Sequence, residues 1–211
     1  MTQDELYASL DYVNHSREKR AEMSGLILDN PHLVKLLMAF AFDVDDPISS
    51  RACWVMEFAA KEDLNYVLPY IDEFTGNLGK VHVDSAVRPV AKICEYLIDA
   101  YFSETRNSEP QNSETRNSKP RNSETQNSKT PNKVQETLTE VHLEHIVTAC
   151  FDWLIGEHKV APQAYAMTCL LLLGRRFDWI YPELKMILEK NYAQGSPAYK
   201  ARARMTLAAL K

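Results

Sequence analysis

The chain contains the same passage twice, and this repetition constrains its fold more than any other feature. Residues 38–74 (MAFAFDVDDPISSRACWVMEFAAKEDLNYVLPYIDEF) align without a gap with residues 151–187 (FDWLIGEHKVAPQAYAMTCLLLLGRRFDWIYPELKMI). The clearest match pairs LNYVLP at 64–69 with FDWIYP at 177–182, where apolar, polar, aromatic, β-branched, bulky and proline residues recur in order. A helical unit present twice predicts a stacked array, in which each unit buries its apolar face against its neighbours.

Moving the frame by one residue extends the match into one more helix. Asp84, Arg88, Ala91, Lys92 and Ile93 then align with Ser196, Lys200, Ala203, Arg204 and Met205. We therefore expect an all-α protein with an internal four-helix duplication.

The apolar periodicity predicts ten helices and no sheet, because no segment shows sustained alternation with period two. The expected helices are 3–14, 17–29, 31–42, 47–61, 64–76, 84–102, 139–155, 161–173, 178–192 and 197–210.

Several expected helix starts have capping signals. Thr2 and Glu5 have capping-box spacing, and so do Thr137 and Glu140. At three more starts a capping side chain precedes a proline, which needs no partner for its missing N–H in the first turn: Asn30-Pro31, Asp46-Pro47 and Ser196-Pro197.

The middle of the chain has a different composition. Residues 103–132 are three near-copies of a decapeptide, SETRNSEPQN, SETRNSKPRN and SETQNSKTPN, which contain no apolar residue to bury. Such a segment cannot recover the entropy lost on ordering. We expect a disordered insertion over 103–133, a tandem expansion in a permissive loop. It would separate helix pairs over 1–102 from helix pairs over 134–211 within one continuous domain.

Composition limits the function classes. The formal net charge of -5 opposes general attraction to nucleic acid or to anionic membranes. The N-terminus does not resemble a leader, and no apolar run, 169–173 included, is long enough to cross a bilayer. The four cysteines lie singly in apolar stretches and form no C-x-x-C pair, so we expect buried thiols and a cytoplasmic location.

Two prolines at corresponding positions, Pro69 and Pro182, should each kink a helix or mark its first turn. Together with DSAVRPVA at 84–91 and SSRA at 49–52, they make residues 31–102 and 139–210 resemble HEAT-like repeats. The resemblance implies an armadillo-type fold, a right-handed, curved α-solenoid of about five helix pairs. It also implies a non-catalytic scaffold that binds a protein segment, an acidic peptide or another anionic ligand on its concave face.

A second resemblance is to a group of short bacterial helical proteins that share stretches such as FDVDDPIS, KVHVDSAVRPVAKICE, ACFDWLIG and SPAYKARAR. Members of this group can have the name adenylosuccinate lyase. This chain lacks the lyase loop S-S-x-M-P-x-K-x-N-P, and Ser49-Ser50-Arg51 is its nearest fragment. No catalytic residue can be assigned from the resemblance, and a C–N lyase remains an alternative to the scaffold.

Basic residues recur at matched places in the expected last helix of each copy. A spacing of four places Arg88 and Lys92 on one helix face, and likewise Lys200 and Arg204. The predicted binding strip consists of Arg51, Arg88, Lys92, Lys200, Arg202 and Arg204. The alternatives are solvated charges or internal ion pairs, and a DNA-binding HEAT-like protein of the alkylation-repair type.

No cofactor and no metal are expected. The FDVDD turn at 42–46 lacks the glycine and the terminal glutamate of a calcium loop, and we expect Asp46 to cap a helix instead. His142 and His145 are suitably spaced for a metal, but no third ligand can be identified.

Overall fold

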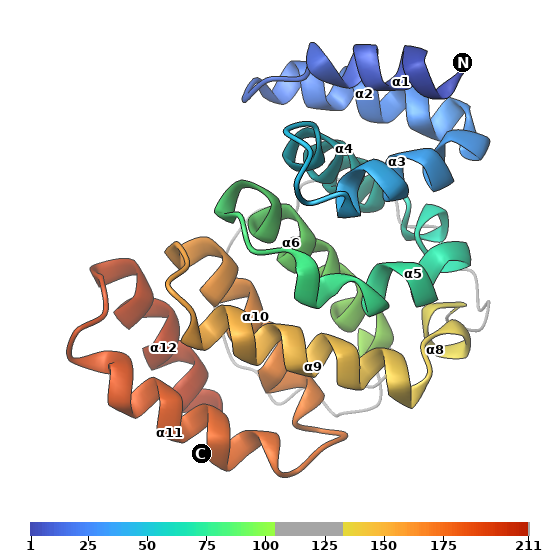
Figure 1. The fold of residues 1–211 in the computed structure, drawn as a ribbon. Helices are drawn as coiled ribbons and strands as arrows, with labels where there is room; N and C mark the ends of the chain where they lie inside the picture. The colour runs from blue at the N-terminus through green and yellow to red at the C-terminus, as the bar shows by residue number, and fades with distance from the viewer. Residues whose placement is uncertain (104–132, 211) are drawn as a thin grey trace, which may run out of the picture.

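The computed structural model describes residues 1–103 and 133–210 (Figure 1). This part of the chain is all-helical and contains no strand. The elements, with η for a 3-10 helix, are α1 (Gln3–Asp11), α2 (Arg17–Asp29), η1 (Pro31–Leu33), α3 (Val34–Phe42), α4 (Ser49–Glu62), η2 (Leu64–Tyr66), η3 (Leu68–Tyr70), α5 (Ile71–Gly76), η4 (Leu78–Lys80), α6 (Asp84–Tyr101), α8 (Lys133–Thr137), α9 (Glu140–Ile155), α10 (Val160–Leu173), α11 (Ile180–Tyr192) and α12 (Pro197–Ala209).

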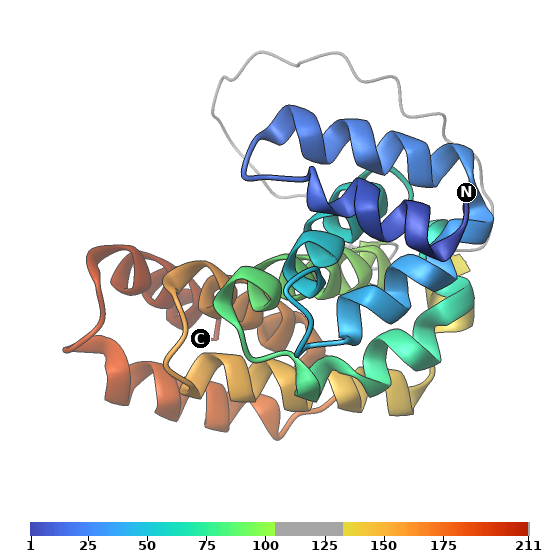
Figure 2. The same ribbon diagram turned by 45° about the horizontal axis from the view of Figure 1, so that its top comes forward.

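The helices lie in two rows. In the first row α2 packs on α4, α4 on α6, α6 on α10, and α10 on α12. The second row consists of α1, α3, α5, α9 and α11, each of which precedes a first-row helix in the chain. Figure 2 shows α3, α5, α9 and α11 below the first row.

Aromatic contacts connect neighbouring members of the second row. The ring of Tyr7 in α1 contacts Phe40 in α3 at a centroid distance of 5.6 Å. Phe42 at the end of α3 contacts Phe74 in α5 at 5.9 Å. Further along, α5 packs on α9. The second row is therefore held by edge-to-face aromatic pairs as well as by aliphatic packing.

The two copies of the passage occupy helices with corresponding neighbours. Residues 38–74 include the end of α3, all of α4 and the first four residues of α5. Residues 151–187 include the end of α9, all of α10 and most of α11. In the first copy α4 lies between α2 and α6, and in the second α10 lies between α6 and α12. Helix α6 is thus in contact with both copies.

Helix starts follow the capping signals in part. The Thr2–Glu5 capping box forms, and Ser196 accepts the backbone N–H of Tyr199 at 3.2 Å. Asn30, however, makes no side-chain cap, and its amide instead donates to the Leu26 carbonyl. The capping box of α9 pairs Thr139 with His142, so the prediction of Thr137 and Glu140 was wrong.

Asp46 also departs from its predicted role. Its carboxylate accepts the N–H of Ile48 at 2.8 Å, which closes a turn of the Asx type. Helix α4 begins only at Ser49 and has no side-chain cap.

The single helix expected over 64–76 is three short elements, η2, η3 and α5. Pro69 lies in the first turn of η3, and Tyr70 leaves helical geometry at φ -118° and ψ 22° before α5 begins. Pro182 is the third residue of α11, where its missing N–H needs no partner. Both prolines therefore mark first turns.

The core is continuous along the rows and includes residues from every helix longer than one turn. All four cysteines are buried and free, as predicted.

The expected disordered segment falls mostly on residues 104–132, which lie outside the described residues. Its two ends are described: Ser103 is exposed, and Lys133 begins α8, a short helix that the sequence did not predict. No single helix of the described ranges is long and apolar enough to cross a membrane. Helix α2 and the η1–α3 segment reach the required length and hydropathy only when taken together, and their axes are bent by 107° relative to each other.

Candidate binding surface

The six predicted site residues lie on three helices that are not all adjacent. Arg51 is in α4, Arg88 and Lys92 are in α6, and the other three are in α12. Helix α10 lies between α6 and α12, and its sequence, VAPQAYAMTCLLLL, contains no charged residue. The six side chains therefore do not form one continuous basic strip.

The cations of α12 are also divided among themselves. Lys200 and Arg204 are one helical turn apart and share a face, whereas Arg202 lies about 200° around the helix from either. Arg204 donates to the hydroxyl of Tyr192 in α11 at 3.3 Å. It thus reaches back toward the second row rather than toward α10.

Each predicted cation in α4 and α6 has a carboxylate partner within the chain. Arg51 bonds to both the carboxylate and the backbone carbonyl of Asp11. Arg88 donates to Glu57 at 3.1 Å, and Lys92 pairs with Glu95, three residues further along α6. An anionic ligand at these positions would have to compete with carboxylates already in place.

Aromatic rings accompany these cations on the first row. The guanidinium of Arg20 in α2 lies 5.8 Å from the centroid of Trp54 and 5.2 Å from that of Phe58, both in α4. The Lys92 ammonium lies 4.9 Å from the Tyr96 ring and 4.6 Å from the Tyr165 ring of α10. Both distances fall within the range of cation–π attraction.

We call this surface the cation–aromatic face. Its members come from α2, α4, α6 and α10, and all are half-buried except Glu57, which is buried. They are Arg20, Trp54, Glu57, Phe58, Arg88, Lys92, Glu95, Tyr96 and Tyr165.

Glu57 is the electrostatic centre of this face. Burial raises the pKa of the Glu57 carboxyl, and the charges of Arg88, Arg20 and Lys92 lower it without cancelling the rise. Burial lowers the pKa of Lys92, but the hydrogen bond and the charge of Glu95 outweigh this effect, so the ammonium pKa is raised. Lys92 therefore stays charged at neutral pH.

A proline in α6 fixes the position of Trp54. Pro89 has no N–H, so the carbonyl of Ser85, four residues earlier, lacks its usual helical donor. The indole N–H of Trp54 donates to this carbonyl at 2.7 Å. Next to it, the hydroxyls of Ser50 and Ser85 lie 2.6 Å apart. These bonds join α4 to α6 and hold one ring of the face in place.

Of the nine residues of this face, the sequence predicted only Arg88 and Lys92 as site residues. It did not single out Arg20, Phe58 or Glu57. Arg20 lies before the duplicated passage, so no internal alignment could have marked it.

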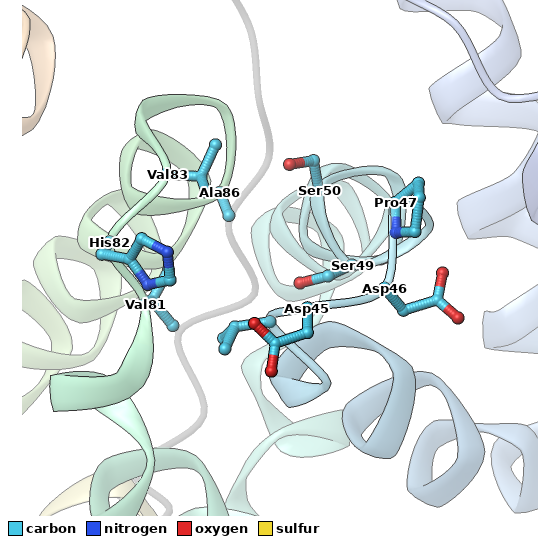
Figure 3. A pocket seen from close by; sticks show the side chains of 10 residues that line it. Asp45, Asp46, Pro47, Ser49, Ser50, Val81, His82, Val83 and Ala86 are labelled. Carbon is cyan, nitrogen blue, oxygen red and sulfur yellow. The ribbon is translucent and has the colours of Figure 1, made fainter.

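A small cleft of about 170 Å³ lies where the turn before α4 faces the turn before α6 (Figure 3). Most polar groups at its wall have partners: Ser49 donates to the Ala41 carbonyl, Ser50 pairs with Ser85, and Asp46 accepts from Ile48 and Tyr7. A second cleft lies between the turns before α10 and α12, at positions that the internal alignment makes equivalent. These clefts follow from the stacking of turns and offer few free groups to a ligand.

Of the two histidines considered for metal binding, His142 has structural partners. His142 is buried, its Nδ1 accepts the N–H of Thr139 at 3.1 Å, and its Nε2 lies 2.5 Å from Asp72. His145 is exposed. Over residues 1–103 and 133–210, no group of three histidine, cysteine or acidic side chains is placed to hold a metal ion.

Comparison with protein-family models, with curated proteins and with solved structures found no match to this chain.

Proposed function

We propose that this protein is a non-catalytic binding scaffold, a HEAT-like α-solenoid of five helix pairs that holds a segment of a partner protein on its cation–aromatic face. The observation behind the proposal is the convergence of rings and charges from four helices, whose residues run from Arg20 to Tyr165 in the sequence. Arrays of stacked helix pairs offer extended surfaces of this kind.

The chemistry of the face favours an amphipathic segment over a simple anion. Trp54 and the two tyrosines, Tyr96 and Tyr165, are half-buried, so they can still contribute apolar area to a contact. The paired cations remain partly accessible, and the Arg88 side chain is 41% exposed. A partner carboxylate near Lys92 would exchange with Glu95, which makes an acidic segment with apolar side chains the best match.

The DNA-binding alternative has less support. Binding to phosphates requires cations free to replace counterions, and Arg51, Arg88 and Lys92 already have carboxylate partners. The lyase alternative has no assigned catalytic residue, and release of fumarate from adenylosuccinate by the purified protein would establish it against the scaffold.

The test is quantitative affinity capture from lysate. The wild type is compared with Arg88→Gln/Lys92→Gln and with the control Lys200→Gln/Arg202→Gln, which removes the same charge from α12. The scaffold proposal expects the α6 variant to lose its specific partners at least tenfold and the control to retain them.

Because Arg88→Gln leaves Glu57 without its ion pair, the single variant Lys92→Gln is captured alongside, and circular dichroism checks that all variants are folded. Equal recovery of the same partners by wild type and by both α6 variants would show that the face is not the binding surface.

A further inference from the structure

A second surface, on the opposite row of helices, has different chemistry. A groove of about 450 Å³ lies between α9 and the turn before α11. The Phe151 and Trp179 rings stack in it with a centroid distance of 5.8 Å and an interplanar angle of 21°. Trp179 is 54% exposed, although tryptophan side chains are on average highly buried in folded proteins.

The internal alignment shows what covers the corresponding place in the first copy. Tyr66 aligns with Trp179. Tyr66 is half-buried, and its hydroxyl donates to the backbone carbonyl of Leu28 at 2.6 Å, so the end of α2 lies against it. Trp179 has no such acceptor for its indole N–H among the described residues. The end of α2, which precedes the first copy, thus covers this place in the first copy, whereas none of the described residues accepts a hydrogen bond at the corresponding place in the second copy.

The groove is acidic as well as aromatic. Glu144 and Asp152 are among its lining residues and lie eight residues apart on α9, a rise of about 12 Å. Neither carboxylate has an ion pair within residues 1–103 and 133–210. The two cations nearest to Trp179 in sequence are directed elsewhere, since Arg176 pairs with Glu140 at 3.2 Å and Arg175 lies 6.0 Å from the Phe102 ring.

Exposed apolar side chains extend the groove along α9. Val141 is 55% exposed and Ile155 is 63% exposed, although both belong to a largely buried helix. Their spacing from Glu144 and Phe151 places all four on one face. From Val141 to Ile155 this face is about 21 Å long, which matches about six residues of extended peptide.

We propose that this groove binds an extended, basic segment of a partner protein, with a lysine or arginine side chain seated over Trp179 between Glu144 and Asp152. A cation is attracted by the face of a tryptophan ring and by both free carboxylates. Apolar residues of the segment would cover Val141 and Ile155, and a backbone carbonyl would accept the indole N–H. The groove is separate from the cation–aromatic face, and it would bind a basic segment where that face would bind an acidic one. This proposal therefore does not depend on the proposed function.

The probe is an acetylated, amidated hexapeptide of alternating arginine and leucine, and its binding to the full chain is measured by isothermal titration calorimetry. A peptide with glutamate in place of arginine is the negative probe. We expect saturable 1:1 binding of the basic peptide only. Glu144→Gln/Asp152→Asn and the single variant Trp179→Ala should each weaken binding at least tenfold.

The matched control is Glu18→Gln/Asp29→Asn, which removes the same charge from exposed positions of α2 and should change the affinity less than twofold. Equal weakening in this control would show that the acidic net charge, rather than the groove, attracts the peptide, and would overturn the proposal. Sedimentation equilibrium of the free protein tests the other occupant. A dimer that Trp179→Ala dissociates would assign the groove to a second copy of this chain and would equally overturn it.

Discussion

At the scale of single residues, Glu57 is the only buried carboxylate among the described residues. Burial raises its pKa despite the ion pair with Arg88. A folded carboxyl that holds its proton more tightly than the unfolded chain gains stability as the pH falls through the raised pKa, and this gain is absent at neutral pH. Glu57→Gln should therefore change the free energy of unfolding by less than about 1 kcal/mol at pH 7, since a neutral acceptor replaces a buried charge.

Urea unfolding at pH 7 and pH 5 measures this effect. On going from pH 7 to pH 5, the wild type should gain stability relative to Glu57→Gln. A loss of more than about 3 kcal/mol in the variant at pH 7 would instead show that the ion pair is strongly stabilising.

Two glycines should respond to alanine in opposite directions. A Cβ on Gly174 would lie 2.0 Å from the Tyr181 ring, whereas a Cβ on Gly25, inside α2, would have nothing within 4 Å. Gly174→Ala should destabilise the protein by about 1–3 kcal/mol through overpacking. Gly25→Ala should stabilise it by about 0.5–1 kcal/mol, because alanine loses less backbone entropy in a helix. Urea denaturation of both variants measures the two changes. A Gly174→Ala variant as stable as the wild type or more stable would contradict the packing at Gly174.

At the scale of elements, Pro89 and Trp54 form a coupled pair across α6 and α4. Trp54→Phe leaves the Ser85 carbonyl without its donor and should cost about 1–2 kcal/mol. In a Pro89→Ala background, the new backbone N–H can reach that carbonyl, so the same substitution should cost less. A double-mutant cycle from urea unfolding gives the coupling directly. Additive effects would show that the proline does not account for the tryptophan bond.

The helices themselves were largely predictable from the sequence. Helix α2 has the expected bounds 17–29, because Ser16 caps it and its interruption at Asn30 is followed by a proline. The segment 64–76 was not predictable, since Pro69 and the non-helical backbone of Tyr70 divide an apolar pattern that looks continuous. Capping by His142 was missed because histidine is not the usual third residue of a capping box.

The cations of the candidate surface were predictable from the sequence, but the order in which their helices pack and the partners of their charges were not. Internal alignment located the cations of α6 and α12, yet it could not show that the uncharged α10 lies between them. The partners of Arg51 and Arg88 are 40 and 31 residues away in sequence, so these ion pairs depend on how helices pack and not on spacing within one helix.

At the scale of the whole molecule, each first-row helix has packed neighbours in its own row, but α12 has one such neighbour where α6 and α10 have two. In arrays of stacked units, stability is a sum of local contacts. Amide hydrogen exchange should therefore be slowest in α6 and α10 and clearly faster in α12, whose Met205 is 66% exposed. Mass spectrometry of exchange in the intact chain measures this order, and protection of α12 equal to that of α10 would contradict it.

The rate at which the four cysteine thiols are alkylated reports separately on the centre of the array. They lie in α4, α6, α9 and α10, and none lies in the first two or the last two helices. Burial raises the pKa of Cys53 to about 12 and also raises the pKa values of Cys94 and Cys150. The pKa of Cys169 is raised by the hydrogen bond that its thiol donates to Cys150 and, next, by burial. Alkylating reagents should therefore modify none of the thiols until the helix pairs in the middle of the array separate. The labelling rate then measures opening of these pairs and does not respond to local unfolding of the helices at either end.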